Sequence, residues 1–178
     1  MRFGWARAAT VTSIAATLLV AACHRAPAVT PEELAKNAAE AAAFMEKNKS
    51  AEGVQTLPSG LQYKVLVSGP SGAASPDRND LVRVDYEGAL TDGTVFDSSF
   101  ERGVPLAIHV DEVVPGWTEA LQRMKAGDEW MLYVPPELGY KDQQAGDIPP
   151  NSVLVFRVKL EDVAPVPGAG RAIGSAQG

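Results

Sequence analysis

Residues 81–99 read LVRVDYEGALTDGTVFDSS, and this stretch decides the fold class. Apolar side chains recur at every second position in its first part, at Val82, Val84 and Tyr86. Successive side chains of a strand point to opposite faces, so this alternation is typical of a half-buried antiparallel strand. The segment TVFDSS, from Thr94, indicates another strand. The sequence therefore predicts two strands of an antiparallel sheet here.

Further strand patterns lie on both sides of this stretch. They are LQYKVLV from Leu61, EWMLYVP from Glu129 and VLVFRVKLEDV from Val153. One helical pattern, from Trp117 to Met124, interrupts them. A twisted antiparallel sheet wrapped around one short helix buries the apolar faces of both in a single core. The expected fold class is therefore α+β.

Composition limits what the chain can do. Its 178 residues, 46% of them hydrophobic, suffice for one sizeable core with appendages. The chain has 22 acidic against 16 basic residues, and a negative body repels phosphate backbones, so we expect no nucleic-acid partner. A single cysteine excludes an internal disulfide framework, and two histidines without companion thiols make no metal-ligand cluster. We expect neither a metal nor a cofactor.

The N-terminus reads MRFGWARAATVTSIAATLLVAAC, with Arg2 and Arg7 before an apolar stretch that ends in small residues. This pattern is typical of a secretory signal and is too short for a comfortable membrane span. The ending at Cys23 resembles the bacterial lipobox, in which the cysteine is lipidated and becomes the first residue. An ordinary signal peptide with a chance cysteine is the alternative. We expect residues 1–22 to be a lipoprotein signal peptide and Cys23 to be the lipidation site.

Such an anchor would hold the protein at a membrane without a spanning helix, since each buried methylene adds about 0.8 kcal/mol. By resemblance to lipoprotein sorting, His24 after the cysteine favours the bacterial outer membrane. The domain would then face the periplasm.

Residues 30–50 read TPEELAKNAAEAAAFMEKNKS and predict a helix. Thr30 can cap it, Pro31 suits its first position, and Glu33 completes a capping box. Its apolar face is shallow because it is made largely of alanine. We expect residues 23–52 to form a lipidated N-terminus and a spacer helix. Because so short a helix is marginal alone, we expect a monomer rather than a dimer. A small dimerisation element is the alternative.

Four segments of the body carry a family resemblance. They are VDYEG with Tyr86, GTVFDSS with Phe96 and Asp97, VVPGW with Val113, Val114 and Trp117, and IPPNSVLVF with Ile148 and Phe156. In order and spacing they resemble the FKBP-type peptidyl-prolyl cis-trans isomerases. The phrase TLPSGLQYKVL, from Thr56, further resembles bacterial exported members, such as the periplasmic and macrophage-infectivity-potentiator-like group. We expect the isomerase domain over residues 53–163 and a disordered tail over residues 164–178.

The resemblance implies a shallow apolar pocket with the indole of Trp117 as its floor. Its walls would come from Tyr86, Phe96, Leu106, Val113, Val114, Ile148 and Phe156, with Leu106 standing where some members have an aromatic residue. Tyr140 would donate from its hydroxyl to one substrate carbonyl, and the backbone N–H of Val114 would donate to another. Asp97 would orient a neighbouring tyrosine. Core packing is the alternative role for Tyr86 and Phe156.

The implied activity is prolyl isomerisation in exported proteins, with proline-containing polypeptides as partners and macrolides such as rapamycin as inhibitors. The alternative is a holdase chaperone or surface binding protein that uses the same pocket without turnover. One departure concerns Tyr140, which family members usually follow with glycine and a longer loop, whereas this chain has Lys141. We expect this shorter loop to narrow substrate choice and Lys141 to favour acidic residues before the proline.

Overall fold

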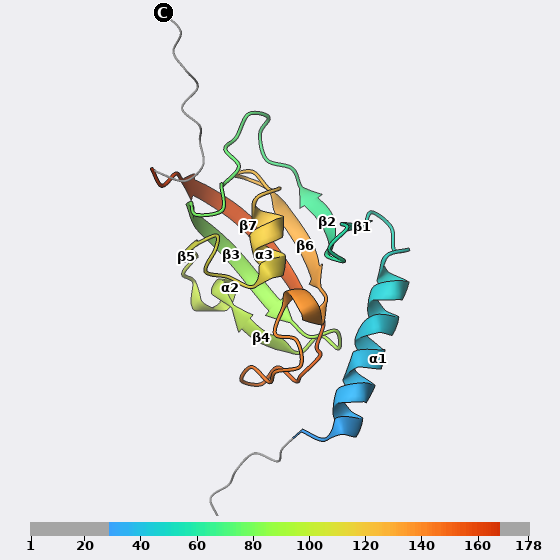
Figure 1. Ribbon diagram of the computed structural model, residues 1–178. Coiled ribbons are helices and arrows are strands. Elements are labelled where there is room, and N and C mark those ends of the chain that lie inside the picture. The colour runs from blue at the N-terminus through green and yellow to red at the C-terminus, as the bar shows by residue number, and fades with distance from the viewer. Residues whose placement is uncertain (1–28, 168–178) are drawn as a thin grey trace, which may run out of the picture.

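The computed structural model describes residues 29–167, drawn in colour in Figure 1. The predicted signal peptide, Cys23 and most of the predicted tail lie outside the described residues. In chain order the elements are α1 (Pro31–Asn48), β1 (Gln55–Thr56), β2 (Gln62–Val67), β3 (Leu81–Ala89), β4 (Val95–Ser98), α2 (Ser99–Arg102), β5 (Leu106–His109), α3 (Pro115–Leu121), β6 (Glu129–Val134), the 3-10 turn η1 (Pro136–Leu138) and β7 (Leu154–Ala164).

Within residues 29–167 the strands form a seven-stranded antiparallel sheet in the order β1-β2-β6-β7-β3-β4, and β5 pairs with β3. The long strand β7 lies between β6 and β3, so that Val158 is paired with Trp130 on one side and with Tyr86 on the other. Figure 1 shows the sheet twisting behind α3, which lies across its face. This arrangement confirms the predicted α+β class.

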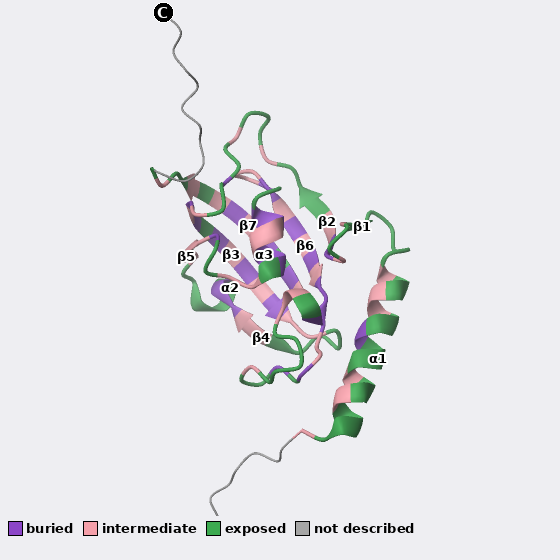
Figure 2. Cartoon of the chain, in the orientation of Figure 1, coloured by how far each residue is buried: buried purple, intermediate pink, exposed green. Residues whose placement is uncertain are grey.

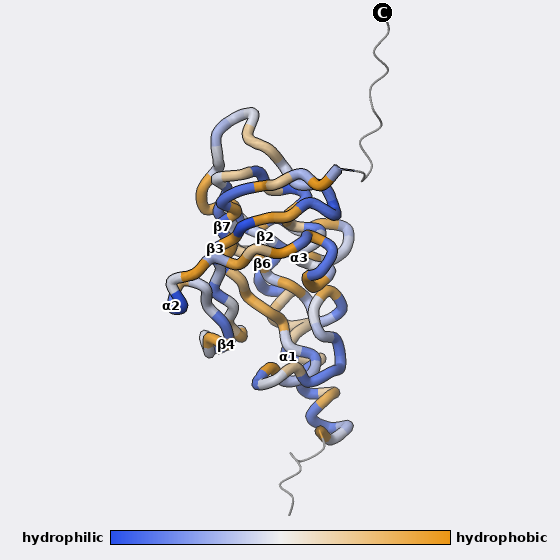
Figure 3. Tube along the Cα trace, turned by 90° about the vertical axis from the view of Figure 1, so that its left-hand side faces the viewer, coloured by the Kyte–Doolittle hydropathy of each residue, from blue (hydrophilic) through white to orange (hydrophobic). Residues whose placement is uncertain are grey.

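The core lies between this face of the sheet and α3. Along β3, Val82, Val84 and Tyr86 are buried, as their alternation predicts. Trp117 and Leu121 of α3 are buried against them. Figure 2 shows the buried segments concentrated on β3, β6, β7 and α3, and Figure 3 shows hydrophobic segments running along β3 and β6. The apolar side of the helix and of the sheet thus share one core.

The five predicted strands are all present, and the predicted central helix differs only at its ends. The structure begins it at Pro115 rather than Trp117 and ends it at Leu121 rather than Met124. Four short elements were not predicted from the sequence, namely β1, β5, α2 and η1. Each has between two and four residues, so its pattern is weak, and the alternation of Leu106 and Ile108 in β5 was overlooked.

Helix α1 confirms the predicted capping box. The backbone N–H of Glu33 donates to Thr30 Oγ1 at 3.2 Å, and that of Thr30 donates to Glu33 Oε2 at 2.8 Å. Ala41 is the one buried residue of α1, and Figure 2 shows most of the helix exposed. Asn37 Nδ2 donates to the carbonyl of Pro150 at 3.0 Å. Asn151 Nδ2 also donates to the carbonyl of Leu34 at 3.1 Å, so α1 contacts the body mainly through polar groups, and its role as a spacer stays a prediction.

The described chain stays on the body slightly beyond the predicted domain boundary at residue 163. Strand β7 continues through Ala164, and the backbone N–H of Val166 donates to Asp80 Oδ1 at 2.9 Å. Because the Asp80 side chain is buried, this contact holds the chain after β7 in place. Among the helices of residues 29–167, none is long and apolar enough to cross a membrane.

Candidate functional site

An open cavity of about 610 Å³ lies beside α3. Its lining residues are Tyr86, Phe96, Asp97, Leu106, Ile108, Glu112, Val113, Val114, Trp117, Tyr140, Ile148 and Phe156. The structure thus brings to one place all ten pocket residues singled out in the sequence. Sequence reasoning missed Ile108 and Glu112. The alternation of Leu106 with Ile108 was an available signal for the first, whereas nothing in the sequence marks the second.

Three aromatic rings meet at right angles at the floor of this cavity. The ring of Trp117 lies 5.3 Å from that of Tyr86 and 5.1 Å from that of Phe156, with interplanar angles of 85° and 82°. Phe96 meets Phe156 in the same edge-to-face manner at 5.6 Å. This geometry is the favoured one for aromatic pairs. Tyr86 and Phe156 are therefore core residues and cavity walls at once, because both are buried and both line the cavity.

The start of α3 places Trp117. A Cβ atom at Gly116 would lie 2.7 Å from Val134 Cγ1, so only glycine lets the helix approach β6 this closely. The hydroxyl of Thr118 donates to the carbonyl of Val110 at 2.7 Å and ties the same turn to the preceding loop. The close packing of α3 on β6 therefore determines where the indole of Trp117 lies at the floor of the cavity.

Asp97 lies in a polar network at one side of the cavity. The hydroxyl of Tyr86 donates to one Asp97 carboxylate oxygen, and the Arg102 guanidinium pairs with the other. Arg102 Nη2 also donates to the Tyr86 hydroxyl oxygen at 3.0 Å. Each group of this network thus contacts the other two. Sequence reasoning did not single out Arg102, because no local pattern links it to the pocket.

The network shifts the pKa of each member. Burial raises the pKa of Asp97, but the hydrogen bonds from Tyr86 and Arg102 and the guanidinium charge together hold that pKa below its usual range. Burial and the hydrogen bond to Asp97 raise the pKa of the Tyr86 phenol. At neutral pH, Asp97 is therefore a carboxylate and Tyr86 a neutral donor.

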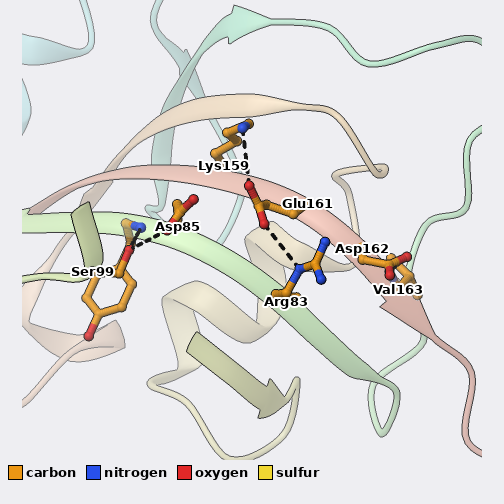
Figure 4. Close-up of polar contacts among 8 residues, drawn as sticks. Arg83, Asp85, Ser99, Lys159, Glu161, Asp162 and Val163 are labelled. Atoms are coloured by element: carbon orange, nitrogen blue, oxygen red, sulfur yellow. Dashed lines mark hydrogen bonds and ion pairs between the residues drawn. The ribbon is translucent and has the colours of Figure 1, made fainter. Parts of the chain in front are cut away.

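Two short elements hold the network together. Strands β3 and β4 pair Gly88 with Asp97, and helix α2 then returns the chain so that Arg102 reaches Asp97. Ser99, the first residue of α2, accepts from the backbone N–H of Tyr86 at 2.8 Å and donates to Asp85 at 2.9 Å. Figure 4 shows Ser99 and Asp85 joined in this way. Tyr86 is thus fixed through its backbone as well as its hydroxyl.

Tyr140 lies at the rim and is 41% exposed. The next residue, Lys141, has a φ of 56°, in the left-handed region that favours glycine. Its N–H donates to the carbonyl of Pro136 at 2.8 Å, and its carbonyl accepts from Asn151 N–H at 2.7 Å. The loop therefore keeps a glycine-like backbone in spite of the lysine. The Lys141 residue is exposed beside Tyr140 but is not among the residues that line the cavity, and the expected attraction of acidic residues stays a prediction.

Three further observations bear on the chemistry available. Among the residues described, the backbone N–H of Val114 has no acceptor, and Val114 lines the cavity just before α3. In the same part of the chain, no group of three or more His, Cys, Asp or Glu side chains could hold a metal ion. His109, a lone histidine, has its Nδ1 3.0 Å from the carbonyl of Asn79.

Residues 72–161 match the family model described as FKBP-type peptidyl-prolyl cis-trans isomerase. The chain belongs to this family. Residues 8–65 match a second model, described as the domain amino-terminal to FKBP-type peptidyl-prolyl isomerase. The aromatic cavity described above therefore lies in the matched family domain.

Two curated relatives and one solved structure show how close the similarity is. The chain is 52% identical over 128 residues to peptidyl-prolyl cis-trans isomerase Mip of Coxiella burnetii, covering 71% of this chain and 55% of the relative. It is 46% identical over 129 residues to outer membrane protein MIP of Legionella longbeachae, covering 72% and 54% respectively. The crystal structure of FkpA from Escherichia coli has 43% identity and a TM-score of 0.72, covering 76% of this chain and 63% of that chain. The chain spans about half the length of these curated relatives.

Proposed function

We propose that this chain is a peptidyl-prolyl cis-trans isomerase that acts on proline-containing polypeptides. The observation that carries the proposal is the aromatic cavity floored by Trp117, whose walls are apolar and whose rim holds a few polar groups. The family match over residues 72–161 and the similarity to isomerases named Mip and FkpA support it. No metal or cofactor is needed for this reaction.

The physical problem is the barrier to rotation about the X-Pro bond. Amide resonance raises this barrier to about 18–20 kcal/mol, so the bond interconverts in tens to hundreds of seconds. In the twisted transition state the amide loses its resonance and much of its carbonyl dipole. A dry apolar cavity therefore penalises the planar ground state more than the twisted state. Apolar walls such as Phe96, Leu106 and Ile148 lower the barrier without any covalent step.

Hydrogen-bond donors at the rim would hold the peptide in the twisted geometry. We assign one such role to the hydroxyl of exposed Tyr140 and another to the unpaired N–H of Val114. We assign to Asp97 the role of orienting Tyr86 beside the carbonyl that rotates, since the two side chains are hydrogen-bonded. Val113 completes the wall beside Val114.

A protease-coupled assay of X-Pro isomerisation on the purified protein, with and without rapamycin, tests the proposal. We expect turnover that rapamycin suppresses by filling the cavity. Absence of turnover with intact rapamycin binding would favour the alternative, a holdase chaperone or surface binding protein that uses the cavity without catalysis. Absence of both would reject the site.

We further propose that the protein is exported and is anchored through acyl chains on Cys23 after removal of residues 1–22. The support is the apolar N-terminal stretch with its final small residues and single cysteine. The similar protein from Legionella longbeachae is named outer membrane protein MIP. We propose that this chain is also held at the outer membrane, with its domain facing the periplasm. Residues 23–52 would then carry the isomerase domain of residues 53–163 away from the lipid, as a monomer.

A further inference from the structure

The rim of the cavity carries an acidic residue, Glu112, for which the proposed reaction has no use. Glu112 lies between β5 and α3, where its backbone N–H donates to the carbonyl of His109 at 3.0 Å. It is exposed, and it lines the cavity next to Val113. Its carboxylate forms no ion pair with any residue of the described chain, residues 29–167. A charged group at the cavity is therefore left for a bound peptide.

The charges of the cavity lining do not balance without such a peptide. Asp97 and Glu112 are the charged residues among those that line it, and both are acidic. Asp97 is paired with Arg102, so its charge is largely compensated inside the protein. Lys141 does not line the cavity. The net charge of the residues that line the cavity is consequently negative and comes from Glu112.

We propose that Glu112 is a specificity-determining residue that favours proline-containing segments with a lysine or arginine beside the proline. The inference rests on the proposed isomerase function of the same cavity. A peptide whose prolyl ring lies on Trp117 must leave its neighbouring side chains at the open rim, where Glu112 lines the cavity. A cationic side chain there gains an ion pair, whereas an acidic one meets an uncompensated like charge.

The expected size of the effect follows from the exposure of the pair. Exposed ion pairs contribute little free energy, so a cationic side chain should raise kcat/KM only about 2- to 5-fold. Repulsion of an acidic side chain acts in the same direction. The preference should also fade with added salt, because exposed charges are screened. The sign is opposite to the acidic preference expected from Lys141 in the sequence.

The test uses peptides Ala-X-Pro-Z-Ala in which X or Z is Lys, Ala or Glu, with isomerisation measured by NMR exchange at low and high salt. Wild type is compared with Glu112→Gln and with Glu52→Gln. Glu52 is exposed in the turn after α1 and does not line the cavity, so its variant has the same change in net charge. For each protein, kcat/KM for the Lys and Glu peptides is divided by that for the Ala peptide.

We expect wild type and Glu52→Gln to favour the Lys peptide over the Glu peptide by about 5-fold at low salt. Glu112→Gln should lose most of this ratio, and high salt should reduce it in wild type. An unchanged ratio in Glu112→Gln, or an equal loss in Glu52→Gln, would overturn the inference. If even the Ala peptide is not turned over, the isomerase proposal fails. In that case, dissociation constants of the same peptides, measured by NMR titration, decide the role of Glu112 through the same comparison of Lys with Glu peptides.

Discussion

The hydroxyl of Tyr86 donates a hydrogen bond to the carboxylate of Asp97, and both groups also contact the guanidinium of Arg102. Tyr86 comes from β3, Asp97 from β4 and Arg102 from α2. The contact therefore joins the buried wall of the cavity to its exposed rim. It also couples the protonation of the rim carboxylate to the position of an aromatic wall.

Arg102→Met should weaken catalysis mainly at acidic pH. The guanidinium helps to hold the pKa of Asp97 below its usual range, so its removal lets that pKa rise. Asp97 then becomes protonated at a higher pH than in wild type and stops accepting from Tyr86. We expect the acidic limb of the pH profile of kcat/KM to move to higher pH. A merely structural role for Arg102 would lower kcat/KM by the same factor at every pH.

Asp97→Val and Tyr140→Phe should each slow turnover and leave the fold intact, since both side chains lie at the rim. Loss of an orienting or donating group is worth about 1–3 kcal/mol, or roughly 5- to 150-fold in kcat/KM. Tyr63→Phe is the matched control, because its hydroxyl donates to Gln55 at 2.9 Å and does not line the cavity. Rates equal to wild type in both rim variants, with thermal unfolding also unchanged, would mean that the site is misplaced.

Lys141→Gly should stabilise the protein. A non-glycine residue in the left-handed region costs about 1–2 kcal/mol. Glycine removes this cost but loses more chain entropy on folding, so we expect a net gain in stability of about 0.5–1 kcal/mol. The measurement is the free energy of unfolding in urea. Lys141→Ala, which removes the charge but keeps the Cβ atom, should show no such gain. Equal stability of the two variants would argue against backbone strain at this position.

Asp128 should make the stability of the protein depend on pH. Burial raises the pKa of its carboxyl, but hydrogen bonds from the Lys125 ammonium and from the backbone N–H groups of Gly69 and Lys125 together hold it below the ordinary value of 3.8. Because the pKa of Asp128 is lower in the folded than in the unfolded state, its ionised carboxylate stabilises the fold at every pH above the unfolded-state pKa. This stabilisation is lost as the pH falls through the folded-state pKa.

The variant Asp128→Asn should therefore be less stable than wild type at neutral pH, by about 1–3 kcal/mol. The difference should shrink in acid as the wild-type carboxyl is protonated. Urea unfolding of both proteins between neutral pH and strong acid measures it. A difference that stays constant over this range would show that the charge of Asp128 is not responsible.

Cys23→Ser should release the protein from membranes and leave kcat/KM unchanged. The cavity residues all lie after Gly53, far along the chain from the proposed acyl site. Membrane fractionation and labelling with a radioactive fatty acid measure the first effect, and the isomerase assay measures the second. Continued membrane association or fatty-acid labelling of the variant would contradict the anchor on Cys23.

The sequence alone was sufficient for the class of fold, because its signals are local. Alternation in residues 81–89 and the capping box at Thr30 act within a few neighbours along the chain, and both are present as predicted. The family motifs likewise marked the residues that the cavity brings together. The elements β1, α2 and η1 escaped prediction because they are only two to four residues long, and β5 escaped it although Leu106 and Ile108 alternate.

Only the tertiary structure decided the charges and partners at the site. Arg102 reaches Asp97 because α2 turns the chain back, and Glu112 lies at the rim because β5 and α3 bracket it. The backbone of Lys141 is fixed by hydrogen bonds to Pro136 and Asn151, and the residue does not line the cavity, which the sequence alone did not indicate. Electrostatic partners depend on distances between segments far apart in the chain, and no local pattern encodes these distances.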